Sequence, residues 1–129
     1  MKTIDQITMF HMAVSDIDKA KAFYADTLGF NVTNEKAYGG KHWVSLELPG
    51  GGASINLTTE HEHMKPGAMK LYLSSPDVEA AYRELIAKGV KPNHKPTDGW
   101  GNWPGFQGTK GKWFDFNDPD GNQWLIVPK

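Results

Sequence analysis

Histidine offers the most versatile chemistry in this sequence, because an imidazole ring can bind a metal ion or transfer a proton near neutral pH. Of the five histidines, His11 lies in an apolar segment that predicts a strand, which makes it a candidate metal ligand, general base or hydrogen-bonding contact. His61-Glu62-His63 has the composition of a chelating triplet, but the proline and glycine that follow favour an exposed loop. His42 and His94 have no partner that the sequence identifies. A site built from His11 with His61 or His63 is therefore an alternative.

Lys70 is the second candidate for chemistry. An amine in a partly apolar cavity can bind a carboxylate or a phenolate. Glu47 and Asp115 fall on predicted neighbouring strands, where they could act as general bases or pair with Lys70. The alternative is a lysine that reaches solvent from a strand end.

A glycine-rich segment from Pro96 to Lys112 carries Trp100, Trp103 and Phe106. We expect a long loop here, and long loops in compact domains are often lids or ligand-binding loops. Exposing three large rings is unfavourable, so they should cover a ligand, a partner subunit or the rest of the chain. Flat, polarisable rings suit an aromatic or polycyclic ligand.

Composition argues against several classes of function. The 129 residues include 14 basic and 15 acidic side chains, with a net charge of -1, and Arg83 is the lone arginine. This charge balance gives no reason to expect nucleic acid as a partner. Cysteine is absent, which excludes disulfides and thiolate metal sites. Neither a membrane-length apolar run nor a signal-peptide pattern occurs, so we expect a cytoplasmic protein without membrane contact.

The elements that must position these side chains follow one pattern that the sequence repeats. Each copy reads as a strand, an amphipathic helix ended by glycine, and three further strands, which we call a βαβββ module. The modules span about residues 5–60 and 68–128. Each is marginal alone and no linker separates them, so residues 1–129 are expected to form a single domain.

Local signals place the helices within each module. Ser15 and Ser75 are the expected N-caps, and Pro76 suits the first helical position. Gly29 and Gly89 are the expected ends, where a left-handed residue closes a helix.

The hairpins of the two modules also align. Trp43-Val44-Ser45-Leu46 corresponds to Trp113-Phe114-Asp115-Phe116, and a Pro/Gly turn follows each strand. The strand that precedes each hairpin is expected near Val32 and near Val90-Lys91.

Alternation along the strands separates a face that the helices cover from an open face. The open face has a polar and aromatic content that is unusual for a core, so it predicts a binding surface. The alternative is a face that is covered by dimerisation or exposed to solvent. The residues expected on the open face are Met9, His11, Ala13, Trp43, Ser45, Glu47, Ser54, Asn56, Thr58, Lys70, Tyr72, Trp113, Asp115, Gln123, Leu125 and Val127.

Three motifs occur at intervals typical of one family. They are His11-Met12-Ala13-Val14-Ser15-Asp16, Phe23-Tyr24-x-x-x-Leu28-Gly29-Phe30 and Phe116-Asn117-Asp118-Pro119-Asp120-Gly121-Asn122. In these motifs, and over nearly the whole chain, the sequence resembles the vicinal oxygen chelate superfamily of glyoxalase I, bleomycin-resistance proteins and extradiol dioxygenases. The resemblance implies an α+β fold in which two tandem βαβββ modules form an incomplete barrel with the helices outside.

Metal-using members of that family take ligands from the first and last strand of each module. Carried onto this sequence, the four positions are Met9, Asn56, Lys70 and Leu125. A thioether, an ammonium group and a leucine are unsuited to an oxygen-preferring divalent metal, and only Asn56 could contribute an oxygen. We therefore expect neither the family's metal site nor another cofactor.

The resemblance then favours metal-independent binding or sequestration of a small aromatic molecule, as in bleomycin-resistance members. Those members form homodimers, so a homodimer is expected here as well. The alternative is a metal-dependent lyase, isomerase or dioxygenase with displaced ligands including His11. A third hypothesis is a regulatory module whose aromatic loop binds a protein. The expected ligand contacts are His11, Trp43, Asn56, Lys70, Tyr72, Trp100, Trp103, Trp113, Gln123 and Leu125.

Overall fold

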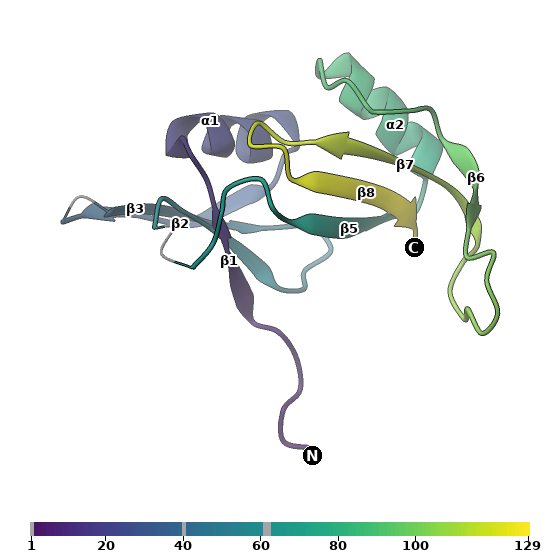
Figure 1. Ribbon diagram of the computed structural model, residues 1–129, viewed down its shortest axis with the longest axis horizontal. Helices are drawn as coiled ribbons and strands as arrows, with labels where there is room; N and C mark the ends of the chain where they lie inside the picture. The colour runs from purple at the N-terminus through teal and green to yellow at the C-terminus, as the bar shows by residue number, and fades with distance from the viewer. Residues whose placement is uncertain (1, 40, 61–62) are drawn as a thin grey trace. The chain divides into compact units, whose positions relative to one another are not determined.

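A computed structural model describes residues 2–39, 41–60 and 63–129 of the chain (Figure 1). It divides into two compact units, Met1–Ala68 and Met69–Lys129, which we call the first and second module. The first contains β1 (Met9–Ala13), α1 (Ile17–Lys21), the π-helix η1 (Ala22–Thr27), β2 (Asn31–Tyr38), β3 (Lys41–Glu47) and β4 (Ser54–Thr58). The second contains β5 (Lys70–Ser75), α2 (Val78–Ala87), β6 (Thr97–Trp100), β7 (Gly111–Asn117) and β8 (Gln123–Pro128).

Each module forms one open four-stranded sheet. The strand orders are β1-β4-β3-β2 and β5-β8-β7-β6, so the same βαβββ topology occurs twice. In each sheet the first and last strands of the module pair in parallel, and the other neighbouring strands pair in antiparallel fashion. The structure thus confirms the predicted α+β class and the two tandem modules.

The repeat holds at the level of single residues. His11 pairs with Asn56 across β1 and β4, and Tyr72 pairs with Leu125 across β5 and β8. The pairs two residues earlier, which include Met9 and Lys70, match in the same way. The predicted alignment of the two copies is therefore confirmed along their first and last strands.

Helical side chains identify the covered face of each sheet. The Tyr24 hydroxyl donates to the Met12 sulfur at 3.5 Å in the first module. In the second, Tyr82 of α2 meets Phe114 edge to face, with ring centres 5.3 Å apart, and Figure 1 shows α2 along that sheet. Full burial of a large apolar side chain contributes about 1.5–3 kcal/mol. The buried apolar residues of this face are Met12, Val44, Leu46, Ile55, Leu57, Phe114, Phe116, Trp124 and Ile126.

The helix N-caps differ from the prediction. Asp16 and Asp77, rather than Ser15 and Ser75, accept the cap hydrogen bonds, from the backbone N–H groups of Lys19 and Ala80 at 3.0 and 2.9 Å. A carboxylate also interacts favourably with the helix dipole, which explains why the aspartate is used when both residues are available. Pro76 accordingly precedes the cap instead of opening the helix.

The helix ends agree with the prediction. Gly29 and Gly89 have φ of +78° and +86°, a left-handed conformation that favours glycine. The first helix changes from α-helix to π-helix before its end: η1 continues α1 directly, and Leu28 is its C-cap.

The second strand of the second module lies later than predicted. It is β6, Thr97–Trp100, not a strand near Val90-Lys91, because Pro92 and Pro96 cannot donate to a strand ladder. The expected loop from Pro96 to Lys112 therefore contains β6 and the start of β7, and only residues 101–110 connect them.

A buried turn closes the second module. The Asp118 carboxylate accepts from the backbone N–H groups of Asp120 and Asn122 and from the Asn122 amide at 2.7–3.0 Å. The side-chain oxygen of Asn122 accepts a hydrogen bond from the backbone N–H of Met69, the residue just before β5, at 2.9 Å. The Asp-Pro-Asp-Gly-Asn motif thus holds the β7–β8 turn against the start of the parallel pair. No helix among the described residues is long and apolar enough to cross a membrane.

Candidate functional site

A row of hydrogen-bonded side chains crosses the open face of the first module. His11, Asn56 and Ser45 are neighbours in register on β1, β4 and β3. The Ser45 hydroxyl donates to the Asn56 carbonyl oxygen at 3.1 Å, and the Asn56 amide nitrogen lies 3.1 Å from His11 Nδ1. Ser45 and Asn56 are buried, whereas His11 is exposed. His11 is therefore the member of this row that can meet a ligand.

Asn56 determines what His11 can offer. With the Asn56 amide donating to Nδ1, the proton of the neutral imidazole lies on Nε2. A protonated Nε2 is a hydrogen-bond donor and lacks the free lone pair that a metal ligand needs. This arrangement fits a role in orienting a ligand better than a role in metal binding.

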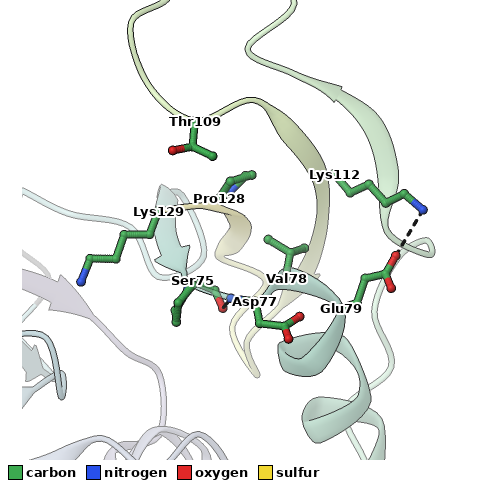
Figure 2. A pocket seen from close by; sticks show the side chains of 9 residues that line it. Ser75, Asp77, Val78, Glu79, Thr109, Lys112, Pro128 and Lys129 are labelled. Atoms are coloured by element: carbon green, nitrogen blue, oxygen red, sulfur yellow. Dashed lines mark hydrogen bonds and ion pairs between the residues drawn. The ribbon is translucent and has the colours of Figure 1, made fainter.

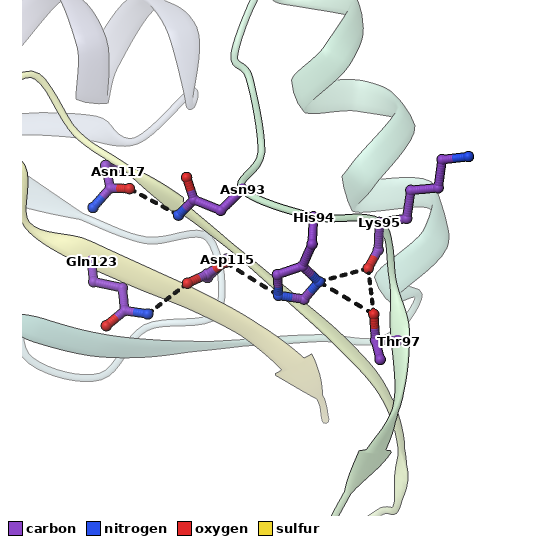
Figure 3. Close-up of polar contacts among 7 residues, drawn as sticks. All are labelled: Asn93, His94, Lys95, Thr97, Asp115, Asn117 and Gln123. Atoms are coloured by element: carbon purple, nitrogen blue, oxygen red, sulfur yellow. Dashed lines mark hydrogen bonds and ion pairs between the residues drawn. The ribbon is translucent and has the colours of Figure 1, made fainter.

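The second module has a different polar group at the corresponding place (Figure 3). Asp115 occupies the position that matches Ser45, is only 6% exposed, and accepts a hydrogen bond from the Gln123 amide nitrogen. Its other oxygen lies 3.2 Å from His94 Nε2. The predicted pairing of Asp115 with Lys70 is therefore replaced by contacts with His94 and Gln123.

His94 holds the segment before β6 against β7. Its Nδ1 lies 2.7 Å from the backbone oxygen of Lys95, and the Thr97 hydroxyl donates to the same oxygen at 2.8 Å. The ring meets Trp113 edge to face, with centres 4.5 Å apart. Nδ1 is thus bonded within the protein, while Nε2 faces the Asp115 carboxylate without a hydrogen bond.

Sequence reasoning missed the role of His94. The available signal was Asp115, a carboxylate between Phe114 and Phe116, because a buried charge requires partners. No local pattern indicates which of the distant histidines that partner is. His42, the other unassigned histidine, lies 3.1 Å from Glu35 on β2.

Aromatic rings form a continuous group in the second module, which we call the aromatic cluster: Tyr72, Trp100, Trp103 and Phe106. Ring centres are 5.7 Å apart for Tyr72 and Trp100, 5.2 Å for Trp100 and Trp103, and 4.8 Å for Trp103 and Phe106. Tyr72 and Trp103 are 53% and 46% exposed, while Trp100 and Phe106 are half-buried. The rings partly cover one another and still leave a large apolar surface accessible.

Lys70 lies beside this cluster. Its Nζ is 5.9 Å from the centre of the Tyr72 ring, within the range of a cation–π contact. The side chain is exposed, so its charge remains available to an anion in solution. The second module thus combines a cation with flat apolar rings.

The ten predicted ligand contacts fall into local groups. Lys70, Tyr72, Trp100 and Trp103 form the cluster and its neighbouring cation, whereas Trp113 and Gln123 contact the Asp115 group. His11 and Asn56 belong to the polar row of the first module. Trp43 is half-buried on β3, and Leu125 is buried on β8, where it supplies surface but no polar group.

The four positions that correspond to the family's metal ligands have different surroundings in the structure. Met9 is exposed, Leu125 is buried, and Asn56 uses its amide for Ser45 and His11. Among residues 2–39, 41–60 and 63–129, no group of three or more His, Cys, Asp and Glu side chains could hold a metal ion. His61, part of the alternative site, lies outside the described residues, and His63 is exposed.

A shallow pocket of about 330 Å³ lies elsewhere in the second module, at the start of α2 (Figure 2). On one side of the pocket, Lys112 Nζ lies 3.2 Å from a Glu79 carboxylate oxygen. The pocket contains none of the predicted ligand contacts. Its lining residues are Ser75, Pro76, Asp77, Val78, Glu79, Thr109, Lys112, Pro128 and Lys129.

Comparison with known proteins identifies relatives over nearly the whole chain. Residues 3–126 match the model of the Glyoxalase/Bleomycin resistance protein/Dioxygenase superfamily. An uncharacterized protein of Mycolicibacterium smegmatis is 31% identical over 84 residues, which are 65% of this chain and 67% of that protein.

Solved structures extend the likeness. TnmS3, an antibiotic binding protein from Streptomyces sp. CB03234, is 28% identical, with a TM-score of 0.82 and coverage of 99% of this chain and 98% of that one. A superfamily member from Sphaerobacter thermophilus is also 28% identical, with a TM-score of 0.77 and coverage of 98% of both chains.

Proposed function

Because the chain belongs to the Glyoxalase/Bleomycin resistance protein/Dioxygenase superfamily, we propose that it binds and sequesters a small aromatic molecule without a resident metal ion. The observation that carries this proposal is the aromatic cluster. Two of its rings are about half exposed, and Lys70 lies next to one of them. A surface of this kind can stack on a planar ligand, while a few polar groups orient it.

The similarity to TnmS3 supports the choice of ligand class. That protein is described as an antibiotic binding protein, and the likeness covers 99% of this chain. We therefore propose an aromatic antibiotic or a comparable metabolite as the ligand. Tyr72, Trp100 and Trp103 would provide the stacking surface, and Lys70 and Gln123 the polar contacts.

Tryptophan fluorescence during titration with a panel of aromatic compounds tests this function. At least one compound should quench the emission saturably, and Trp103→Ala should weaken its binding by about tenfold, as expected for loss of one stacking ring. Ile86→Ala is the matched control, because Ile86 is an exposed apolar residue on α2 outside the cluster. Equal affinities for both variants, or no quenching by any compound, would refute the proposal.

Elemental analysis addresses the metal-dependent alternative. The proposal predicts no stoichiometric zinc, nickel, manganese or iron in protein purified without an affinity tag. A stoichiometric ion that is lost in His11→Ala would instead establish an enzyme-type site with displaced ligands.

We also propose a homodimer, by analogy with bleomycin-resistance members, and light scattering at micromolar concentration tests it.

A further inference from the structure

Gln123 has a fixed orientation that determines which ligand groups it can recognise. Its amide nitrogen donates to a carboxylate oxygen of Asp115, and a carboxylate can only accept. The amide therefore cannot turn around without placing two oxygens against each other. Figure 3 shows the carbonyl oxygen of Gln123 pointing away from Asp115. Gln123 accordingly presents an acceptor, not a donor, to its surroundings.

Asp115 is itself held in place. It is 6% exposed, and the oxygen that does not contact Gln123 lies 3.2 Å from His94 Nε2. His94 in turn contacts the Lys95 backbone oxygen and packs against Trp113. His94 Nε2 and the facing Asp115 oxygen do not hydrogen-bond to each other. The Gln123 amide is therefore the hydrogen-bond partner that the buried Asp115 carboxylate has among these groups, and this bond orients Gln123 before any ligand arrives.

Lys70 is the neighbour of Gln123 in the parallel register of β5 and β8. Residues paired in this way lie on one face of a sheet, with their strands about 4.8 Å apart. Lys70 Nζ also lies over the Tyr72 ring, and Tyr72 contacts Trp100. A cation, a fixed acceptor and a stacking surface are therefore adjacent within the second module.

From this placement we infer that the ligand is a planar aromatic anion that also carries a hydroxyl group. The ring stacks on Tyr72 and Trp100, the ionised oxygen meets the Lys70 ammonium, and the hydroxyl donates to the carbonyl oxygen of Gln123. A methyl ether has no proton to donate to Gln123, and a neutral ester has no ionised oxygen for the Lys70 ammonium. This inference specifies the ligand class and rests on the proposed function.

Isothermal titration calorimetry with naphthoate, hydroxynaphthoates differing in hydroxyl position, their methyl ethers and their neutral esters tests the inference. At least one hydroxynaphthoate should bind about tenfold more tightly than its methyl ether and than naphthoate, as expected for a hydrogen bond in a partly buried site. Lys70→Met should weaken every anion by about tenfold and leave the neutral esters unchanged.

Gln123→Met should remove the preference for the hydroxyl group and leave the affinity for naphthoate unchanged. Asp115→Asn is a second variant, because an amide in place of the carboxylate permits Gln123 to turn, and it should reduce the same preference. Circular dichroism verifies that both variants are folded, and the exposed Lys70→Met variant supplies an independent test.

Two failures are distinguishable. If other aromatic compounds quench tryptophan fluorescence but no hydroxynaphthoate is preferred over its ether, this inference is overturned and the proposed function stands. Persistence of the preference in Gln123→Met overturns it as well. If no aromatic compound binds at all, the proposed function itself fails.

Discussion

The two modules share a backbone plan and differ in the chemistry of their open faces. His11, Asn56 and Ser45 in the first module correspond to Tyr72, Leu125 and Asp115 in the second. The first row is a chain of polar side chains that hydrogen-bond to one another. The second has a buried carboxylate at one end and an exposed ring at the other. The comparison shows that strand register was preserved while the side chains on one face diverged.

The connection between the middle strands differs as well. In the first module β2 ends at Tyr38 and β3 begins at Lys41, whereas residues 101–110 separate β6 from β7 in the second. The longer connection carries Trp103 and Phe106, which complete the aromatic cluster. The proposed contact with a planar ligand therefore depends on this longer connection.

The largest difference between the modules should appear on removal of the buried carboxylate. Asp115→Ala leaves the Gln123 amide without its carboxylate partner, and we expect a loss of about 3 kcal/mol in the free energy of unfolding, as for a hydrogen bond to a charged group. Ser45→Ala at the matching position removes one neutral hydrogen bond and should cost about 1 kcal/mol. Urea denaturation measures both, and equal losses would contradict the distinction.

The connection after β6 allows a test of its close packing. Gly101 and Gly105 have φ of +85° and +82°, but an added Cβ at Gly101 would lie 2.5 Å from the Phe106 ring, while nothing lies within 4 Å at Gly105. Gly105→Ala should cost about 1 kcal/mol through backbone strain alone. Gly101→Ala should cost about 2 kcal/mol and also weaken ligand binding, because Phe106 must move.

Thermal unfolding together with the fluorescence titration measures these effects. Equal destabilisation by the two alanines would show that the Phe106 ring yields freely, and the aromatic cluster would then not be a rigid surface.

The polar row of the first module should behave as a coupled unit. Ser45→Ala and Asn56→Leu each leave a buried partner unsatisfied and should cost about 1 and about 2 kcal/mol, respectively. The double variant gives this module the leucine found in the second and should cost about 1 kcal/mol less than the sum of the single changes. Strict additivity in chemical denaturation would rule out the coupling.

The smallest expected effect concerns the ion pair that joins the helical segment of each module to its sheet. Lys21 lies 2.7 Å from Glu35 in the first module, as Lys112 lies 3.2 Å from Glu79 in the second. The hydrogen bond from Lys21, with a further one from His42, holds the pKa of the Glu35 carboxyl below its ordinary value. The stability from this lowered pKa is present above the unfolded-state pKa and is lost as the pH falls through the folded-state value.

NMR titration of the Glu35 carboxyl measures this shift. Lys21→Met should move the pKa of Glu35 upward, because the hydrogen bond and charge that lower it are removed. The prediction fails if Glu35 titrates identically in the variant and the parent protein.

Periodicity predicted the architecture because each strand must bury one face under a helix. Leu57 and Trp124, for example, were assigned correctly to the covered faces. The N-caps were wrong by one or two residues because serine and aspartate are both good caps, and β6 was missed because prolines and glycines obscure its pattern. His94 was not assigned a partner because its contact with Asp115 depends on how the segment before β6 folds, which no local pattern encodes.

The indole N–H NMR signals of the tryptophans test most directly whether the aromatic cluster receives a planar ligand. Titration with an aromatic compound that quenches fluorescence should shift the signals of Trp100 and Trp103 saturably, while the buried Trp124 signal stays in place. Saturable binding that leaves Trp100 and Trp103 unperturbed would contradict the account.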